Sequence, residues 1–206
     1  MAIVLGYHGC DLKTAQAVLG GSSFEPSNKP YDWLGEGAYF WEWDILRAYD
    51  WAKERRSHGP CVVGAAIDLG NCLDLTLQAG IRAVKRAHES YVNLQTMAGK
   101  SLPVNKDGKD AANPGDRVIR LLDRAVIDHL HSVYQEAAKK SPGKAIEFET
   151  VRALFPEGKE IYSSSGFREK THVQIAVKKM TRVLGVFQIP QYQLEEYKLP
   201  LDMYGC

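Results

Sequence analysis

The chain has 206 residues, of which 45% are hydrophobic and 25% are charged, and its formal net charge is +1. These values indicate a folded globular protein with a sizeable core, and they exclude a disordered or fibrous chain. No stretch approaches eighteen consecutive apolar residues and the start lacks the basic segment of a secretory signal, so we expect a cytoplasmic protein without a membrane span. The four cysteines show no CxxC spacing, so neither a zinc site nor a disulfide framework is expected.

The middle of the chain is basic relative to its flanks. Residues 82–144 hold 12 Lys and Arg against 7 Asp and Glu, whereas residues 1–81 hold 6 against 10. Such a region can contact a polyanion, but a run of charge is more often a solvated helix face. The composition leaves both interpretations open.

The first third of the sequence predicts short strands and helices divided by segments rich in glycine, serine and proline. Asp11 and Asp44 each precede an apolar pattern with helical spacing and are suitable N-caps. Residues 61–69 are almost all apolar, which is typical of a central strand buried on both faces. In chain order, we expect a strand over 2–7, a helix over 11–21, a loop over 22–37, a strand over 38–41, a helix over 44–51 and a strand over 61–69.

Two longer helices are predicted in the basic middle, as an insertion at about 76–144 in an α+β core. The first helix covers about 76–97, and a polar segment over 99–115 follows it. Asn113, Pro114 and Asp116 form a start signature for the second helix, which ends near Ser141. We expect its buried stripe to consist of Val118, Leu122, Ala125, Val126, His129, Leu130 and Val133. Strands over 172–177 and 183–189 are expected to form an antiparallel pair.

Three short motifs, at strand ends or within strands, carry candidate chemistry. They are Tyr7-His8-Gly9-Cys10, Gly35-Glu36-Gly37-Ala38-Tyr39-Phe40 and His172-Val173-Gln174-Ile175. In order and spacing they resemble the signature of the ADP-ribosyltransferase superfamily, in the branch that places a His, a Tyr and a Glu on three core strands. The resemblance covers roughly residues 3–75 and 160–190, and the helical middle lies outside it.

The resemblance implies one domain over 1–206 with an ADP-ribosyltransferase-like split β-sheet, and a reaction that uses NAD as substrate and no metal. It implies that His8 donates a hydrogen bond to a ribose hydroxyl and that the Gly9 backbone meets the nicotinamide carboxamide. The ring of Tyr39 would stack on the nicotinamide. Phe40 and Arg168 are further cofactor-binding candidates, although strand alternation also predicts Phe40 in the core.

The sequence departs from the family pattern at the glutamate, whose matching position is Gln174. A glutamine oxygen can accept a hydrogen bond from the ribose 2′-hydroxyl, but it carries no charge and is no base. Gln174 can position NAD for a nucleophile that needs little activation, or Glu169 or Glu160 can supply a carboxylate. The third interpretation is a protein that binds NAD or ADP-ribose without turnover. Glu42 is one more acidic candidate.

The leading hypothesis is a mono-ADP-ribosyltransferase with catalytic residues His8, Tyr39 and Gln174, which transfers ADP-ribose to a macromolecule and releases nicotinamide. The basic middle slightly favours nucleic acid over protein as the acceptor. The resemblance also permits a bacterial toxin or defence effector with an antitoxin or inhibitor partner. An RNA 2′-phosphotransferase is a less favoured alternative, because the His8 and Tyr39 motifs carry no arginine.

Overall fold

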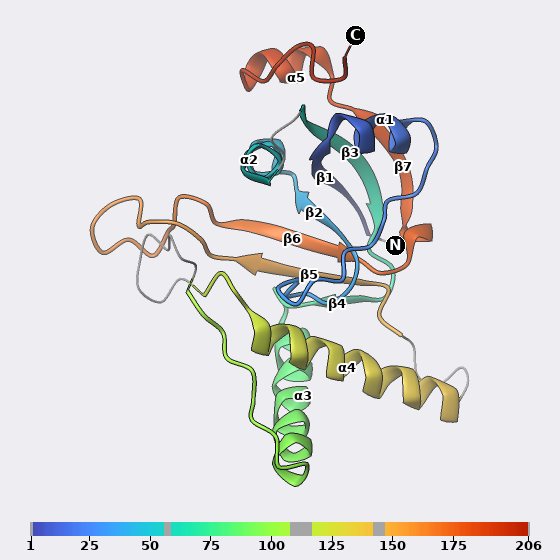
Figure 1. Ribbon diagram of the computed structural model, residues 1–206, viewed down its shortest axis with the longest axis vertical. Helices are drawn as coiled ribbons and strands as arrows, with labels where there is room; N and C mark the ends of the chain where they lie inside the picture. The colour runs from blue at the N-terminus through green and yellow to red at the C-terminus, as the bar shows by residue number, and fades with distance from the viewer. Residues whose placement is uncertain (1, 56–58, 108–116, 142–146, 206) are drawn as a thin grey trace.

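The protein has a mixed α+β architecture built on one central sheet. The computed structural model describes residues 2–55, 59–107, 117–141 and 147–205 (Figure 1). Within these ranges seven strands form the sheet in the order β4-β5-β6-β2-β1-β3-β7. The strands are β1 (Ile3–Asp11), β2 (Ala38–Glu42), β3 (Pro60–Asp68), β4 (Cys72–Asp74), β5 (Thr150–Phe155), β6 (His172–Val177) and β7 (Val183–Gln188). The expected α+β class is confirmed.

Two helices begin directly after the acidic N-caps that the sequence predicts, Asp11 and Asp44. The Asp11 carboxylate accepts a hydrogen bond from Thr14 N at 2.7 Å, and the Asp44 carboxylate accepts one from Arg47 N at 2.9 Å. Each bond satisfies a backbone donor that the first helical turn leaves without a partner. The helices of the described ranges are α1 (Leu12–Leu19), α2 (Ile45–Arg55), α3 (Gln78–Met97), α4 (Leu121–Lys140) and α5 (Gln191–Glu196), with a short 3₁₀ turn at Met180–Arg182.

The sheet divides between β1 and β2. Strand β1 pairs with β3 in nine register pairs, but with β2 only through Gly6 with Glu42 and Tyr7 with Trp41. In Figure 1, β5 and β6 run across the picture while β1, β3 and β7 run nearly upright. The short β1–β2 junction therefore joins two halves of the sheet that point in different directions.

The two long helices form the connection between β4 and β5, which are parallel neighbours. Parallel strands need a long crossover, and α3 and α4 supply it (Figure 1). These helices pack with Trp33, Leu34 and the β4–β5–β6 half in one hydrophobic cluster. A second cluster around β1, β3 and Phe40 includes residues of α1, α2 and α5. The expected insertion at about 76–144 lies within the crossover.

The prediction that the strands over 172–177 and 183–189, now β6 and β7, form an antiparallel pair is wrong. Strand β6 lies between β5 and β2, whereas β7 pairs with β3 at the other edge of the sheet. The turn Met180–Arg182 therefore carries the chain from one half of the sheet to the other. Close spacing in sequence resembles a hairpin, but it does not determine which neighbour a strand takes.

The start of the second long helix also differs from the prediction. Helix α4 begins at Leu121, because Ile119 is held extended by two backbone hydrogen bonds with Lys106. Val118 therefore lies before the helix, and Val133 is 48% exposed rather than part of the buried stripe. The signature at residues 113–116 lies outside the described residues. Strand β5 was not predicted, because Arg152 interrupts its apolar run.

The C-terminal segment is fixed to the sheet through a buried tyrosine. The hydroxyl of Tyr204 accepts a hydrogen bond from Ile189 N at 2.8 Å and donates one to the Val62 carbonyl at 2.7 Å. Its side chain is 8% exposed, and burial raises its pKa to about 12. The hydroxyl thus connects three segments that are distant in sequence.

Replacing this hydroxyl tests its contribution to stability. Tyr204→Phe leaves a buried donor and a buried acceptor without partners, so we expect the free energy of unfolding to fall by about 1–3 kcal/mol. Urea denaturation followed by circular dichroism measures the change. Tyr192→Phe, at a tyrosine that is 65% exposed, is the matched control and should leave the free energy unchanged.

Candidate functional site

The side chain of His8 lies at the division between β1 and β2. Its Nδ1 donates to the main-chain carbonyl of Tyr39 at 2.8 Å, and its ring packs against Phe24 and Phe40, with centroids 5.0 and 5.6 Å away. With Nδ1 as the donor, Nε2 is the acceptor nitrogen of the neutral ring. Neutral His8 would therefore accept a hydrogen bond from a ribose hydroxyl, which corrects the direction expected from the sequence.

The β1–β2 ladder has a regular start. Trp43 N donates to the Leu5 carbonyl at 3.1 Å, and Tyr7 pairs with Trp41 two residues further along. In an antiparallel ladder every second residue directs its N–H and C=O to the same neighbour. The next residue of β1 to face β2 in this way is Gly9.

Gly9 does not continue the ladder. Its partner would be Tyr39, whose carbonyl accepts a hydrogen bond from the His8 side chain. Within the described chain, the recorded β1–β2 pairs end before Gly9. The peptide edge of Gly9, which is a buried residue, therefore faces the division of the sheet.

The lack of a side chain at Gly9 also has a packing role. A Cβ atom there would lie 2.1 Å from the Ala48 carbonyl oxygen of α2, which no packing adjustment of a side chain could relieve. Glycine is thus required for α2 to lie against β1. The sequence motif alone suggested only the approach of a ligand.

Tyr39 and Gln174 lie on neighbouring strands and on the same face. Tyr39 pairs with Ala176 and Trp41 pairs with Gln174, so the two predicted site residues are diagonal neighbours across β2 and β6. Together with His8, they occupy the three adjacent strands β1, β2 and β6. The register thus places on adjacent strands three residues that are up to 166 positions apart in the sequence, with the His8 ring packed on the Phe40 side of the sheet.

The amide of Gln174 has a fixed orientation. Trp33 Nε1 donates to its Oε1 at 2.6 Å, which identifies the oxygen side of the amide. Trp33 is 6% exposed, and its ring packs 5.1 Å from that of Phe155. A carbonyl oxygen accepts two hydrogen bonds, so Oε1 retains the capacity to accept one more.

The loop before β2 holds the Tyr39 hydroxyl. This hydroxyl accepts from Leu34 N at 3.0 Å and donates to the Gly35 carbonyl at 2.8 Å. Burial raises the pKa of Tyr39, and the charge of Asp32 raises it further, so the phenol stays protonated. Gly35 has φ +91°, a conformation that L side chains rarely adopt. The loop therefore fixes the tilt of the half-buried Tyr39 ring.

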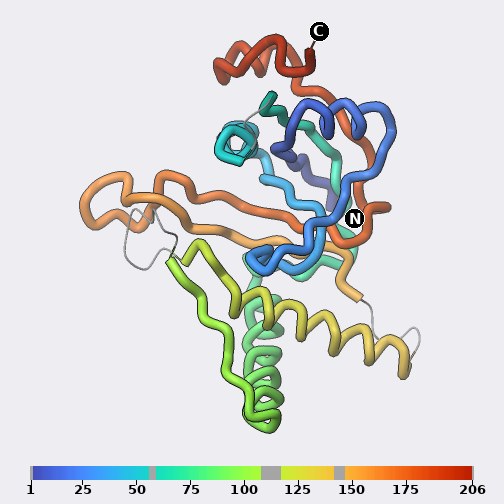
Figure 2. The backbone as a smooth tube through the Cα atoms, viewed as in Figure 1, coloured from blue at the N-terminus to red at the C-terminus, as the bar shows by residue number. Residues whose placement is uncertain are grey.

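Helix α4 holds the same loop from the other side. The backbone trace shows the segment between α1 and β2 running down to the long helices (Figure 2). The Arg124 guanidinium donates to the Lys29 carbonyl at 3.1 Å and to Asn28 Oδ1 at 2.6 Å, and its Nε pairs with Asp128 at 2.5 Å. Helix α4 thus takes part in positioning Tyr39.

The structure corrects the assignment of Phe40 to the cofactor site. Its side chain is fully buried between the rings of His8 and Phe24, so it has no surface to offer a ligand. Arg168, the other cofactor candidate, lies in the hairpin that joins β5 and β6. Its guanidinium donates to the Gly158 carbonyl at 3.3 Å across this hairpin, which extends beyond the sheet (Figure 1).

The acidic candidates occupy three different environments. Glu42 forms an ion pair with Arg152 at 2.5 Å, while Asp44, not Glu42, caps the next helix. Glu160 accepts from Ser164 N at 3.0 Å within the β5–β6 hairpin, and Glu169 is exposed in that hairpin. None of these recorded contacts brings a carboxylate to Gln174.

A cluster of buried polar side chains, which the sequence did not indicate, lies beside Gln174. Its members are Trp41, His172 and Arg47. His172 and Trp41 pack with ring centroids 6.3 Å apart, and Arg47 of α2 pairs with Glu157 at 2.8 Å. Among the described residues, Trp41 Nε1, His172 Nε2 and two nitrogens of Arg47 are buried without a hydrogen-bond partner. Burial lowers the pKa of His172, and the charge of Arg47 lowers it further. A single arginine in an amphipathic helix gives no sequence signal that it is buried and paired with a distant glutamate.

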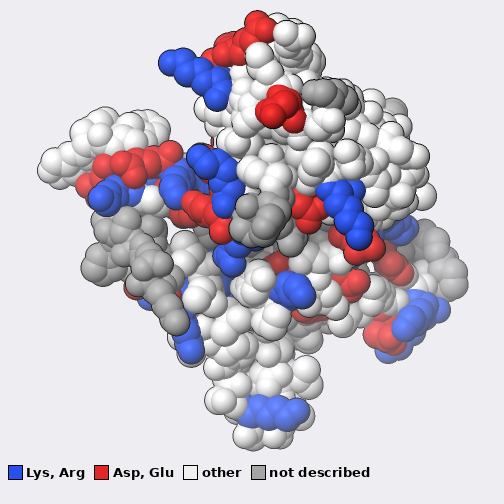
Figure 3. Space-filling view, turned by 45° about the horizontal axis from the view of Figure 1, so that its top comes forward, with Lys and Arg blue, Asp and Glu red and all other residues white. Residues whose placement is uncertain are grey.

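The basic middle does not form a uniform positive surface. Four of its cations pair with acids of the same region, in the pairs Arg117–Asp107, Arg120–Asp123, Arg124–Asp128 and Lys139–Glu136. On the face shown in Figure 3, positive and negative side chains are interspersed. Arg82, Lys85 and Arg86 of α3 are exposed at helical spacing and form a short basic strip.

Comparisons with known proteins do not identify the chain. No protein-family model, curated protein or solved structure matches it. No group of three or more metal-ligating side chains occurs among the described residues. In the same part of the chain, no helix is long and apolar enough to span a bilayer.

Buried His131 of α4 supports the Gly35 loop and should make stability depend on pH. Burial, together with the charges of Lys178 and Arg124, lowers its pKa from 6.5 to about 3. Because the unfolded chain binds this proton and the folded chain does not, the stability present above pH 6.5 is lost as the pH falls toward 3. Between pH 6.5 and 3 we expect the free energy of unfolding of the wild type to fall more steeply than that of His131→Leu, by about 1.4 kcal/mol per pH unit. Urea denaturation at several pH values checks this, and parallel curves for the two proteins would contradict it.

Proposed function

We propose that the protein is an NAD-dependent mono-ADP-ribosyltransferase whose site lies at the division between β1 and β2. The observation that carries the proposal is the end of the β1–β2 pairing before Gly9, at the place where the Tyr39 carbonyl accepts a hydrogen bond from His8. A primary carboxamide such as that of nicotinamide matches one N–H and one C=O on a single peptide edge. The three sequence motifs, on three adjacent strands, support the same assignment.

The proposed reaction breaks the bond between the ribose C1′ and the nicotinamide nitrogen. The bonding electrons leave with nicotinamide, whose ring loses its positive charge, and positive charge develops on the ribose. The acceptor then bonds to C1′ and releases a proton to solvent. The Tyr39 ring would stack on the departing nicotinamide, while His8 Nε2 and Gln174 Oε1 accept hydrogen bonds from ribose hydroxyls and hold the sugar in place.

Gln174 determines which acceptors are compatible with this chemistry. Its oxygen is oriented by Trp33 but carries no charge, so it positions the ribose without removing a proton. We therefore propose an acceptor that needs little activation, such as a nucleobase nitrogen. The exposed strip of Arg82, Lys85 and Arg86 supports nucleic acid over protein as the acceptor.

One observation favours a second candidate function. Gln174 Oε1 is already engaged by Trp33, and the recorded contacts place no carboxylate beside it. A protein that binds NAD or ADP-ribose without turnover would have this arrangement. Toxin or defence roles, and an inhibitor partner, remain proposals that follow from the transferase assignment.

Nicotinamide release separates the two functions. Incubation with NAD labelled in the nicotinamide ring, in the presence of RNA, DNA or protein, should release free nicotinamide and attach ADP-ribose to one acceptor class. NAD binding measured by calorimetry without release in any mixture would support the binding module instead. NAD-dependent loss of an RNA 2′-phosphate would identify a phosphotransferase.

Substitution of Gln174 tests its role in positioning the ribose. Gln174→Ala should lower kcat/KM for NAD at least about a hundredfold, or about 2.7 kcal/mol, because the hydrogen bond to the sugar is lost. Gln188→Ala, at an exposed glutamine of β7, is the matched control and should keep full activity. Full activity of Gln174→Ala would move the catalytic role to another residue.

A further inference from the structure

A cavity lies between the crossover helices and the sheet. Its volume is about 370 Å³, which falls within the range of about 300–1,000 Å³ that is usual for small-molecule pockets. The apolar part of its lining comes from both helices, from the segment after β4 and from the loop before β2. These side chains are Trp33, Leu75, Ile81, Val84, Leu122, Val126 and Ile127.

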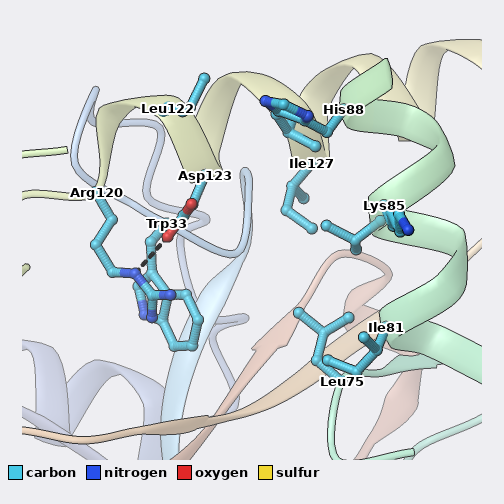
Figure 4. A pocket seen from close by; sticks show the side chains of 11 residues that line it. Trp33, Leu75, Ile81, Lys85, His88, Arg120, Leu122, Asp123 and Ile127 are labelled. Atoms are coloured by element: carbon cyan, nitrogen blue, oxygen red, sulfur yellow. Dashed lines mark hydrogen bonds and ion pairs between the residues drawn. The ribbon is translucent and has the colours of Figure 1, made fainter. Parts of the chain in front are cut away.

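The polar side chains of the cavity are mainly cationic. Arg120 lies over the Trp33 ring, 4.0 Å from its centroid, and its Nε pairs with Asp123 at 2.5 Å. Figure 4 shows this group at one side of the cavity and α3, with Lys85 and His88, at the other. Two cations against one carboxylate leave a net positive charge beside an apolar interior.

The stacked pair of Arg120 and Trp33 gives the cavity a flat wall. Trp33 is 6% exposed, and Arg120 lies over the face of its ring. A guanidinium plane can itself stack on an aromatic ring, and its remaining N–H groups can bind an anionic group. A flat wall with such donors, beside an apolar interior, is suited to a planar ring that carries a negative group.

We infer that this cavity is a binding site for a small planar aromatic anion. The apolar lining takes the ring system, and Arg120 takes the negative group. Trp33 also donates to Gln174, so a ligand here would share a wall with the proposed NAD site without occupying it. The inference does not depend on the transferase activity.

A fluorescence titration with 8-anilinonaphthalene-1-sulfonate tests the site. Val84→Trp fills the cavity from α3 and should weaken binding of the dye by about tenfold or more. Leu94→Trp, at a position of the same helix that is 52% exposed, should bind the dye as wild type does. Near-ultraviolet circular dichroism shows that each variant is folded. Equal binding by wild type and Val84→Trp would overturn the inference.

A second pair of measurements tests the charge. N-phenyl-1-naphthylamine has the same rings without the sulfonate, and wild type should bind it more weakly than the sulfonated dye. Arg120→Gln should remove this preference, because the cation that meets the sulfonate is lost. Equal affinity of wild type for the two dyes would contradict the anionic part of the inference.

Competition identifies the source of the anion. Displacement of the dye by AMP would assign the site to nucleotides, and displacement by 1-naphthalenesulfonate alone would assign it to aromatic acids. Failure of both to displace the dye would overturn the inference. Nicotinamide release, measured separately, reports on the transferase and not on this cavity.

Discussion

The hydrogen bond from His8 to the Tyr39 carbonyl is the interaction on which the proposed site depends. It engages the Tyr39 carbonyl at the place where the β1–β2 ladder ends, and the two strands share only two register pairs. The halves of the sheet can then take different directions, and the Gly9 peptide edge faces the space between them. The His8 side chain thus links the division of the sheet to the proposed ligand site.

The two halves of the sheet are supported by different helices, and the site receives residues from both. Helix α2 packs against Gly9 from one half, and the α4 contacts with the loop before β2 fix Tyr39 from the other. Trp33 connects this loop to Gln174 and is also a wall of the cavity under α3 and α4. The crossover helices therefore contribute to the site as well as to the core.

Local sequence signals predicted the elements well where their cause is local. The caps at Asp11 and Asp44, the central strand β3 and the order of the three motifs are of this kind. The pairing of β6 with β2 and of β7 with β3 depends on the whole sheet, so spacing alone suggested the wrong pair. Burial of Phe40 followed from alternation, whereas the Arg47–Glu157 pair joins residues 110 positions apart and has no local signal. The contact of Trp33 with Gln174 is likewise visible only in three dimensions.

The central claim is that the Gly9 peptide edge receives the nicotinamide carboxamide, and the backbone amide of Gly9 reports on it directly. The measurement is the NMR chemical shift and the hydrogen-exchange rate of this amide in the Gln174→Ala protein. This variant is used because it should consume NAD only slowly. The account predicts that NAD shifts the Gly9 signal and slows its exchange, while the amide of Gly185, on the outer strand β7, is unaffected. Saturating NAD that leaves the Gly9 amide unchanged would contradict the account.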